Sequence, residues 1–424
     1  MWLLDNSFVT IRRMGERSVV ARSPGRQPQQ RAVRNTELML DSSTRALAAN
    51  GWASFTLARV AREMGISERP VRNRARNRSH LAAITWTERS GPLLVAAVTR
   101  CMAGFKQARE TGDSADLCSA LMAMLSRGVE LDAAAELLIC SNFDPDVAEA
   151  VDADLAPLVR RLITPGKSLS PDDAARAAYV LALAFGLLFM ARYPRAQSKR
   201  VGDALPVWVA ALTSDATAQP LPKKDARHID VSPVLTADDP ALDALLSSTL
   251  ELVGTRGFDG VTVAEIARQA GFTEGLVFNR YSSKLDMFID ATRRQNEAGW
   301  KLNHDFVQAL EDDFGQGIAE AVMIREAQKP GRDLGRNMAL EQVRMTWHDP
   351  DLAAAARTQM DDFRADLLKR PGWGVIETEG DFTINIAVSL GTYALPRLAP
   401  KCFKLPWDVV TVPLFAAFDA RATA

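Results

Sequence analysis

The chain has 424 residues, of which 47% are hydrophobic and 24% charged, and its formal net charge is −1. This balance excludes an intrinsically disordered chain, and the length exceeds what one hydrophobic core usually supports. The charge is uneven, because residues 1–212 carry 28 Lys and Arg against 21 Asp and Glu, whereas residues 213–424 carry 23 against 31. Residues 1–80 alone hold 15 Arg against six acidic residues. Such a block favours a polyanionic partner, although a basic disordered tail has a similar composition.

The first 34 residues predict a flexible basic arm. Residues 1–34 are rich in Arg, Gln and Pro around the sequence RSPGRQPQQR and show no apolar periodicity. The chain opens with a short apolar run that its arginines follow, whereas a secretory signal peptide has the opposite order. A cytoplasmic protein is therefore expected.

From about residue 36 the sequence predicts an all-α fold. Apolar residues recur at spacings of three and four, with Gly and Pro between the segments and no persistent strand alternation. A first head is predicted over residues 35–85 and contains TLARVAREMGISERPVRNRARNR, residues 56–78. Thr56 can cap a short helix there, but Arg59 stands where an acidic residue would complete a capping box.

A second short helix of this head is predicted to begin after Ser67 as its N-cap. Pro70 then falls in the first turn, where a missing amide hydrogen costs little, although it should push Arg69 away from helical angles. Five arginines lie on or just after this helix: Arg69, Arg72, Arg74, Arg76 and Arg78.

Residues 86–212 predict a helical body. Its longest apolar run, AYVLALAFGLLFMA at 178–191, is shorter than the roughly 20 residues that cross a bilayer, so a buried core helix is expected. The four cysteines have no metal-binding spacing and are expected to be buried, reduced thiols: Cys101, Cys118, Cys140 and Cys402. The four histidines are scattered as well, so neither a metal nor another cofactor is expected.

Residues 213–238 predict a linker, since the stretch TSDATAQPLPKKDARHIDVSPVLT contains three prolines and no amphipathic face. Helical periodicity resumes in a second predicted head, residues 239–291, followed by a second helical body over 292–424. In the second head, Thr262-Val-Ala-Glu265 forms a capping box that opens a short helix. Gly271 makes a turn, and Thr273 can cap the next helix, EGLVFNRY.

Two short helices joined by a tight glycine turn and packed under a first helix form a helix-turn-helix. The second helix of such a motif enters the major groove of DNA. A small helical bundle without DNA-binding activity would show the same spacing, so this pattern alone leaves both interpretations open.

The two heads are similar to each other in sequence. Between residues 51–74 and 257–280, ten of 24 positions are identical without a gap, at an offset of 206. Farther along, the motif DPDVAEA at 144–150 and the apolar helix around Gly186 both recur 205 positions later, as DPDLAAA and around Gly391. Anchors kept in one order over this distance predict the duplication of a subunit of roughly 190 residues.

The segment GFDGVTVAEIARQAGFTEGLVFNRYSSKLDMF resembles the DNA-binding signature of the tetracycline-repressor (TetR) family of bacterial regulators. The shared pattern is a Gly and an aromatic residue, a Thr that opens a helix, IA..AG, and a recognition helix that ends in two aromatic positions and a Lys. The resemblance implies an all-helical subunit with a DNA-binding head and a ligand-binding, dimerising body, which accounts for each half of the chain.

In the second head, the resemblance assigns base contacts to the start of the recognition helix and phosphate contacts to Phe278, Arg280 and Lys284, with Tyr281 in a buried position. Phe278 stands where the family has Tyr and lacks the hydroxyl that would bond a phosphate. Residues 235–300 also hold ten acidic against six basic residues, which weakens the attraction to DNA. The expected DNA-binding set is Thr262, Thr273, Glu274, Gly275, Leu276, Phe278, Asn279, Arg280 and Lys284.

In the first head, Arg72 and Ala75 replace the two aromatic residues. One interpretation is a head that grips the DNA backbone and reads guanine through Arg; the other is a degenerate head whose arginines are simply solvated. The expected DNA-binding set is Thr56, Ser67, Arg69, Arg72, Asn73, Arg74, Arg76 and Arg78.

Since members of the family work as homodimers, the resemblance implies an intramolecular pseudo-dimer with two non-identical heads on one operator. Its seam is expected in the last two helices of each half, residues 172–192 with 204–212 and residues 382–396 with 407–419. The recognition helices would then lie about one helical turn of DNA apart, roughly 34–36 Å.

The expected function is that of a transcriptional regulator, a repressor that binds double-stranded DNA and responds to a small apolar effector whose pocket the sequence does not identify. The alternative is an interaction or ligand-sequestering protein that kept the fold and lost sequence-specific DNA binding. The sequence contains no Gly-rich phosphate loop, nucleophile elbow or metal spacing, so no enzymatic activity is expected. Further self-association of the chain stays open.

Overall fold

The computed structural model describes residues 26–126, 128–193, 198–223, 238–369 and 378–422. Within these ranges the chain is helical, without β-strands, and its one isolated β-bridge joins Gly166 and Leu169. The predicted all-α fold is therefore confirmed. We call residues 26–223 the N-terminal half and residues 238–422 the C-terminal half.

The helices of the N-terminal half are α1 (Arg26–Ser54), α2 (Leu57–Glu63), α3 (Arg69–Arg72), α4 (Arg78–Thr85), the π-helical turn η1 (Trp86–Ser90), α5 (Gly91–Thr111), α6 (Ala115–Leu125), α7 (Val129–Cys140), α8 (Pro145–Ile163), α9 (Pro171–Met190) and α10 (Ser198–Thr213). The helices of the C-terminal half are α11 (Pro240–Arg256), η3 (Phe258–Gly260), α12 (Val263–Gln269), α13 (Glu274–Phe278), α14 (Lys284–Phe314), α15 (Gln316–Ala327), α16 (Asp333–Thr346), α17 (Pro350–Leu367), α18 (Glu379–Leu398), η5 (Cys402–Lys404) and α19 (Asp408–Ala422).

Several helix boundaries in the two halves have the same local cause. Asp144 caps α8 and Asp349 caps α17, each with a Pro in the first turn and nearly the same backbone angles at the cap. Thr56 caps α2 and Thr262 caps α12. Helices of comparable size thus follow one another in the same order, with the single long helix α14 standing where the N-terminal half has α4, η1 and α5.

The predicted arm differs from the expectation in extent, whereas residues 214–223 of the predicted linker are not helical. Residues 1–25 and 224–237 lie outside the described residues. Residues 26–34, predicted to belong to the arm, form the first turns of α1, so the arm prediction is wrong for them. Residues 214–223 run past the ends of α9 and α19, where the backbone amide of Gln219 donates to Asp408 at 2.6 Å.

The centre of the molecule is the crossing of α9 and α18. The apolar run 178–191 lies almost entirely in α9, which is long and apolar enough to span a membrane but is 94% buried inside the fold over that window. The prediction of a core helix is confirmed. Three of the four cysteines are buried, Cys118 is partly buried, and all four are free thiols.

The two central helices touch through their backbones. A Cβ atom added to Gly186 would lie 1.7 Å from the carbonyl oxygen of Ala387, and one added to Gly391 would lie 1.7 Å from that of Ala182. Only glycine fits at either position, because any side chain would overlap the facing helix. The two contacts are reciprocal, since Gly186 and Ala182 lie 205 positions before Gly391 and Ala387.

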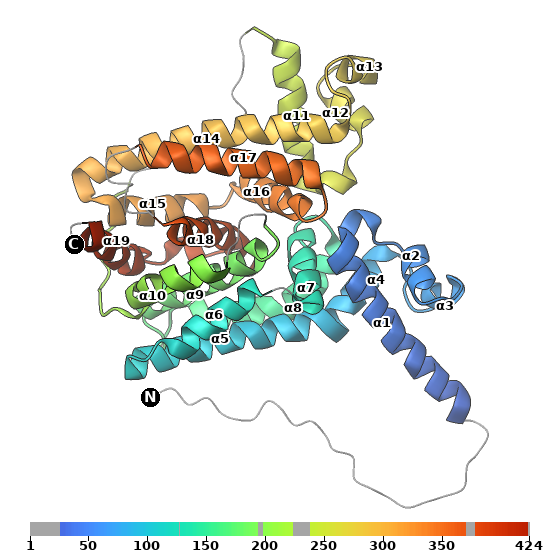
Figure 1. Cartoon of the computed structure of the whole chain (residues 1–424), viewed down its shortest axis with the longest axis horizontal. Helices are drawn as coiled ribbons and strands as arrows, with labels where there is room; N and C mark the ends of the chain where they lie inside the picture. Colours follow the sequence, from blue (N-terminus) through green and yellow to red (C-terminus); the bar gives the residue numbers. More distant parts are fainter. Residues whose placement is uncertain (1–25, 127, 194–197, 224–237, 370–377, 423–424) are drawn as a thin grey trace, which may run out of the picture.

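The last helices of the two halves complete this central layer. α10 packs against α18, α19 packs against α9, and α10 and α19 touch each other. Trp208 in α10 donates its indole N–H to Asp381 in α18 at 2.9 Å. Buried apolar residues from Met39 to Phe418 form one continuous cluster across both halves. Figure 1 shows the remaining body helices on either side of this layer, with α1–α4 and α11–α13 at the end away from the C terminus.

Candidate nucleic-acid interface

The second head is built from α11, α12 and α13. Leu245, Leu246, Leu250 and Val253 bury one face of α11 against α12, as the periodicity predicted. The predicted capping box is confirmed: the Thr262 hydroxyl accepts the Glu265 amide at 3.2 Å, and Glu265 accepts the Thr262 amide at 2.8 Å. That amide bond and the bonds from Thr262 and Arg256 hold the pKa of Glu265 at about 2.

The turn of this motif depends on Gly271, which adopts the left-handed φ of +81°. Thr273 is the N-cap of α13, as expected, although its hydroxyl caps no backbone amide. Val277 is the buried residue of α13 and anchors this helix to the rest of the second head. The start of α13 therefore faces outward, with Thr273, Glu274 and Gly275 exposed, Leu276 partly buried, and Phe278 exposed by 53%.

Other members of the predicted set have intramolecular partners. Lys284 is partly buried, donates to the carbonyl oxygens of Phe258 at 2.8 Å and Val261 at 2.7 Å, and lies over the Phe258 ring. Burial lowers the pKa of this ammonium group. The structure thus places Lys284 as a brace of its own head, and it does not bring this residue to the exposed surface of α13.

Arg280 and Tyr281 follow α13 and are also engaged. Arg280 is exposed but forms an ion pair with Asp239, the N-cap of α11. One of its hydrogen bonds, from Nη2 to Oδ1 of Asp239, is 3.2 Å long. Tyr281, predicted to be buried, is only partly buried, and its hydroxyl donates to Asp290 at 2.7 Å. Asn279 is exposed. Thr262 is exposed too, but its hydroxyl belongs to the capping box.

The first head has the same arrangement with different caps. Thr56 caps α2 through the amide of Arg59 at 3.1 Å, and Gly65 makes the turn with a φ of +69°. The prediction that Ser67 caps the next helix is wrong, because the N-cap is Glu68, without a side-chain cap bond. The prediction for Arg69 is wrong as well, since α3 begins at Arg69 with Pro70 inside its first turn. A proline there needs no amide partner, so a one-residue shift of the cap accommodates both residues.

The arginines of the first head are mostly on the surface. Arg69, Arg72, Arg74 and Arg76 are exposed, as are Ser67 and Asn73. Arg72 pairs with Glu68 at 2.7 Å but keeps 62% of its side chain exposed, and Arg76 pairs with Asp146 of α8 at 2.9 Å. Arg78 differs, because it is partly buried over the ring of Trp52.

The two heads therefore present different charges. Exposed guanidinium groups lie on α3 and just after it, whereas the surface of α13 carries Glu274 and Phe278. Sequence reasoning missed one shared feature: Arg62 and Arg268, at corresponding positions in α2 and α12, are both exposed. Their identity at the offset of 206 residues was the available signal.

Both heads rest on one buried charge network beneath them. Glu136 of α7 accepts the backbone amide of Trp52 in the first head at 2.7 Å, and Glu341 of α16 accepts that of Phe258 in the second head at 2.6 Å. Arg344 of α16 donates to Glu136 at 2.8 Å and to Glu341 at 2.8 Å. One guanidinium group thus joins the carboxylates that support the two heads.

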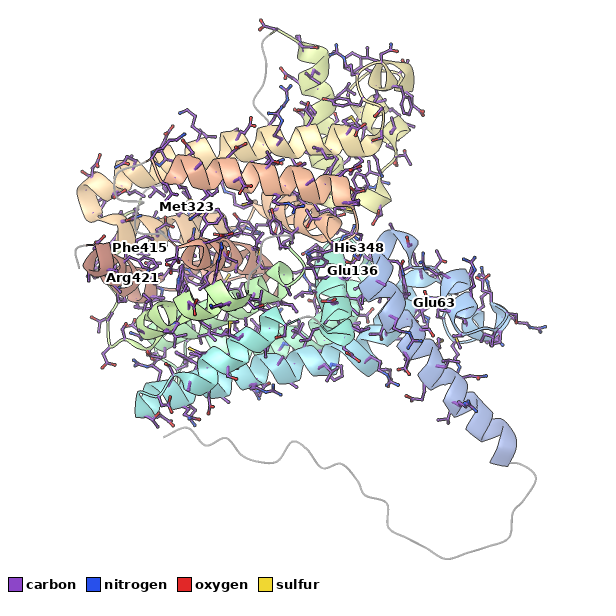
Figure 2. All side chains as sticks on the ribbon, viewed as in Figure 1. Glu63, Glu136, Met323, His348, Phe415 and Arg421 are labelled. Carbon is purple, nitrogen blue, oxygen red and sulfur yellow. The ribbon has the colours of Figure 1, made fainter. Side chains whose placement is uncertain are left out.

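Two further residues complete this network. Arg344 also donates to Asp259 at 2.8 Å, and the His348 ring lies 3.0 Å from Glu136. Burial opposes the charge of Glu136, but Arg344 and His348 outweigh it and hold its pKa at about 2. Figure 2 shows Glu136 and His348 where the two halves meet. No local sequence pattern predicts this contact, because Glu136 and Arg344 lie more than 200 positions apart.

The same region contains a second reciprocal pair of contacts between the halves. Gly51, at the end of α1, lies against the ring of His348, and Gly257, at the end of α11, lies against the ring of Phe143. Both glycines have a left-handed φ, of +67° and +72°. The end of each head's first helix therefore packs against a residue of the opposite half.

Comparison with protein families bears on the second head. Residues 245–291 match the model described as bacterial regulatory proteins, tetR family. The match supports a DNA-binding regulator of the TetR family, and it spans α11, the helix-turn-helix of α12 and α13, and the start of α14. Among curated proteins, none matches the chain. TetR-family regulators bind double-stranded DNA through this motif, which identifies the exposed side of α13 as the candidate interface.

Proposed function

We propose that the chain is a ligand-responsive transcriptional repressor made of two fused, non-identical TetR-like subunits. In this proposal residues 35–85 are the first head, 86–212 its body and 213–238 the linker. Residues 239–291 are the second head and 292–424 its body. The two subunits fold onto each other as an intramolecular pseudo-dimer, and both heads bind one operator.

The reciprocal crossing of α9 and α18 is the observation that carries this proposal. A two-fold interface is self-complementary, so that residue i of one subunit meets residue j of the other and the reverse contact also exists. Gly186 against Ala387 and Gly391 against Ala182 have this relation at an offset of 205. The contacts of Gly51 with His348 and of Gly257 with Phe143 follow the same rule beneath the heads.

The different surfaces of the two heads suggest different tasks. The exposed Arg69, Arg72 and Arg74 suit phosphate contacts and the O6 and N7 acceptors of guanine. In the second head, Thr273, Glu274, Gly275 and Leu276 offer a small, weakly charged surface for base edges. The first head would then supply most of the attraction to DNA, and the second would add sequence selectivity.

A ligand could control both heads through α16. Ala339, Gln342 and Val343 of this helix line a cavity of about 220 Å³ in the C-terminal half, while Glu341 and Arg344 of the same helix hold the network beneath the heads. A ligand that favours a shifted position of α16 would change the separation of the heads and weaken their fit to successive major grooves.

A gel-shift titration across salt concentrations tests this function. We expect salt-sensitive duplex binding, and the double substitution Arg72→Glu and Arg74→Glu should reduce both the affinity and the magnitude of the salt slope, by about 0.9 for each lost phosphate contact. The matched control is Arg100→Glu with Arg161→Glu, which makes the same charge change at exposed body positions. The absence of salt-sensitive duplex binding would overturn the proposal.

The acidic second head favours a second candidate function, an interaction or ligand-sequestering protein without sequence-specific DNA binding. Under that alternative, the charge reversals at Arg72 and Arg74 would have no larger effect on duplex affinity than the control reversals.

A further inference from the structure

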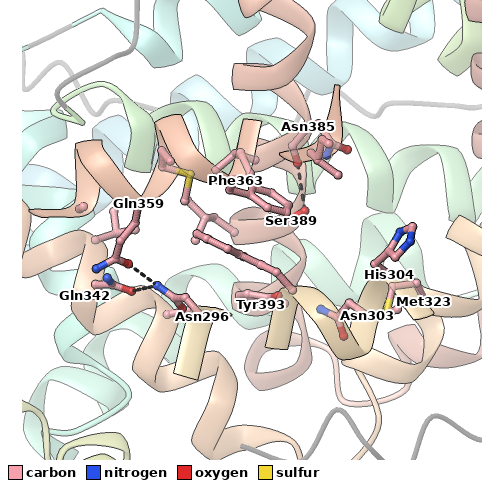
Figure 3. Close-up of a pocket in the computed structure, with 18 of the residues that line it drawn as sticks. Asn296, Asn303, His304, Met323, Gln342, Gln359, Phe363, Asn385, Ser389 and Tyr393 are labelled. Atoms are coloured by element: carbon pink, nitrogen blue, oxygen red, sulfur yellow. Dashed lines mark hydrogen bonds between the residues drawn. The ribbon is translucent and has the colours of Figure 1, made fainter. Parts of the chain in front are cut away.

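The cavity in the C-terminal half has an unusual charge. It lies between α14, α15, α16, α17 and α18, and Figure 3 shows aromatic and amide side chains around it. Among the described residues that line it there is no Lys or Arg, His304 is the only imidazole, and Glu320 of α15 is the only carboxylate. Glu320 has no hydrogen-bond or ion-pair partner among the described residues. Glu320 is partly buried, and a carboxylate withdrawn from water without a Lys or Arg partner is costly, so the cavity favours a positive ligand and disfavours an anion.

The polar lining adds a second acceptor. The side-chain oxygen of Asn303 is buried without a hydrogen-bond partner in the described structure. By contrast, Asn296 is already satisfied, because it donates to Gln342 at 3.1 Å and to Gln359 at 2.9 Å, as Figure 3 shows. Glu320 and Asn303 therefore leave acceptors open toward the cavity, and the amide nitrogen of Gln359 is a donor left open there. An ammonium group that donates hydrogen bonds would use the two acceptors.

The apolar lining indicates the rest of the ligand. Trp300 and Phe363 are stacked with their ring centroids 4.1 Å apart, and Tyr393 lies on another wall. Aromatic faces attract cations and pack against other rings. The volume of about 220 Å³ exceeds the cavity of about 150 Å³ that holds benzene, and it leaves room for a short polar chain on such a ring.

We propose that this cavity binds a small aryl-alkyl ammonium ion, whose nitrogen pairs with Glu320 and whose ring lies among Trp300, Phe363 and Tyr393. Binding itself follows from the cavity alone, and only its regulatory consequence rests on the proposed function. Because α16 lines the same cavity, the ammonium ion is the ligand class that would release the heads from DNA.

Calorimetric titration of the full chain with three probes of similar size tests this assignment. Phenethylammonium should bind at least tenfold more tightly than 2-phenylethanol, and phenylacetate should bind more weakly still. The variant Glu320→Gln should lose the preference for the ammonium probe, whereas Glu130→Gln, an exposed carboxylate on α7, should keep it. Melting curves of both variants show whether they are folded.

The three probes tested on the unaltered protein show whether the cavity prefers an ammonium ion, even if the Glu320→Gln variant does not fold. Equal or tighter binding of the alcohol or the carboxylate, or no binding of phenethylammonium up to ~10 mM, would overturn the assignment. These outcomes leave the proposed DNA-binding function intact, because duplex affinity is measured without any probe. Conversely, ammonium binding with no duplex binding would contradict the regulator and support the ligand site.

Discussion

At the scale of single residues, Phe278 is the most exposed apolar side chain on the second head's recognition helix, at 53%. We predict that Phe278→Tyr strengthens duplex binding, because the added hydroxyl can donate to a phosphate oxygen. A hydrogen bond of about 0.5–1.5 kcal/mol corresponds to roughly a two- to tenfold gain in affinity. Fluorescence anisotropy with a labelled duplex at constant salt measures this gain. Unchanged affinity would mean that residue 278 does not approach the DNA backbone.

The charge of Glu320 gives a pH-dependent prediction. Burial, reinforced by Glu311, raises the pKa of Glu320 to about 7, so the folded protein holds a proton that the unfolded chain releases at lower pH. Ionisation of Glu320 therefore lowers the free energy of unfolding as pH rises from about 4.5 to 7, and the loss is complete above that range.

Accordingly, Glu320→Gln should match the unaltered protein near pH 4.5 and exceed its free energy of unfolding by roughly 1–2 kcal/mol at pH 8. Other titratable groups lie close by: His304 lines the same cavity, and Glu311 and Tyr179 lie near Glu320. The variant and the unaltered protein both contain these three residues, so the difference in stability between them reports on Glu320. Denaturant unfolding at several pH values measures the difference. A difference that does not change with pH would contradict the assignment of this carboxylate.

Sequence reasoning at this scale succeeded where the cause was local. The capping box of Thr262 and Glu265 and the turn glycine Gly271 depend on neighbours within a few positions, and both predictions were confirmed. The intramolecular bonds of Lys284 were not predicted, because the carbonyl groups of Phe258 and Val261 that accept them belong to a preceding loop. The predicted N-cap, Ser67, is one residue too early. Pro70 falls in the first helical turn whether Ser67 or Glu68 is the cap, so the proline does not distinguish the two positions.

At the scale of elements, α16 is the helix on which both heads depend. Arg344→Leu would leave Glu136 and Glu341 buried without their shared cation, and we expect it to lower the free energy of unfolding by about 3–5 kcal/mol. Adding Glu136→Gln should recover part of this loss, because the amide removes one uncompensated charge and still accepts the Trp52 amide. Chemical denaturation measures both, with the exposed Arg100→Leu as the control. If Arg344→Leu were as stable as the control, the network would not hold the heads.

Most helices could be expected from apolar spacing, since each buries a continuous face. The start of α1 at Arg26 could not be expected from the sequence, because the stretch RSPGRQPQQR has no apolar face that predicts a helix. The two sides of α16 were also hidden from the sequence. Glu341 and Arg344 lie on its network side and Gln342 on its cavity side, and only the packing of α7, α11 and α18 around it separates them.

At the scale of the whole molecule, the contact of α9 with α18 decides whether the halves stay together. Gly186→Ala places a Cβ where it would lie 1.7 Å from the Ala387 carbonyl oxygen, so the helices must separate. We expect a loss of about 2–4 kcal/mol in the free energy of unfolding. Gly202→Ala in α10 is the matched control, because its Cβ would meet only Met122 at 3.7 Å, and alanine favours the helix. Equal stability of the two variants would show that the crossing tolerates separation.

The repeated motifs predict two related halves, because they keep one order and nearly one offset. How the halves meet was only partly accessible. The sequence pointed to the last helices of each half, but the backbone contacts of Gly186 and Gly391 and the network around Arg344 join positions more than 200 residues apart, which no local pattern reveals.

The most direct test of the central proposal, that two heads of one chain bind one duplex, is a hydroxyl-radical footprint of a selected duplex in a complex of one chain with one DNA. We predict two protected stretches on the same face, about one helical turn or roughly 10 base pairs apart, and loss of one stretch when Arg72 and Arg74 are reversed. A single protected stretch that is unaffected by these reversals, or a second stretch that requires a second chain, would contradict it.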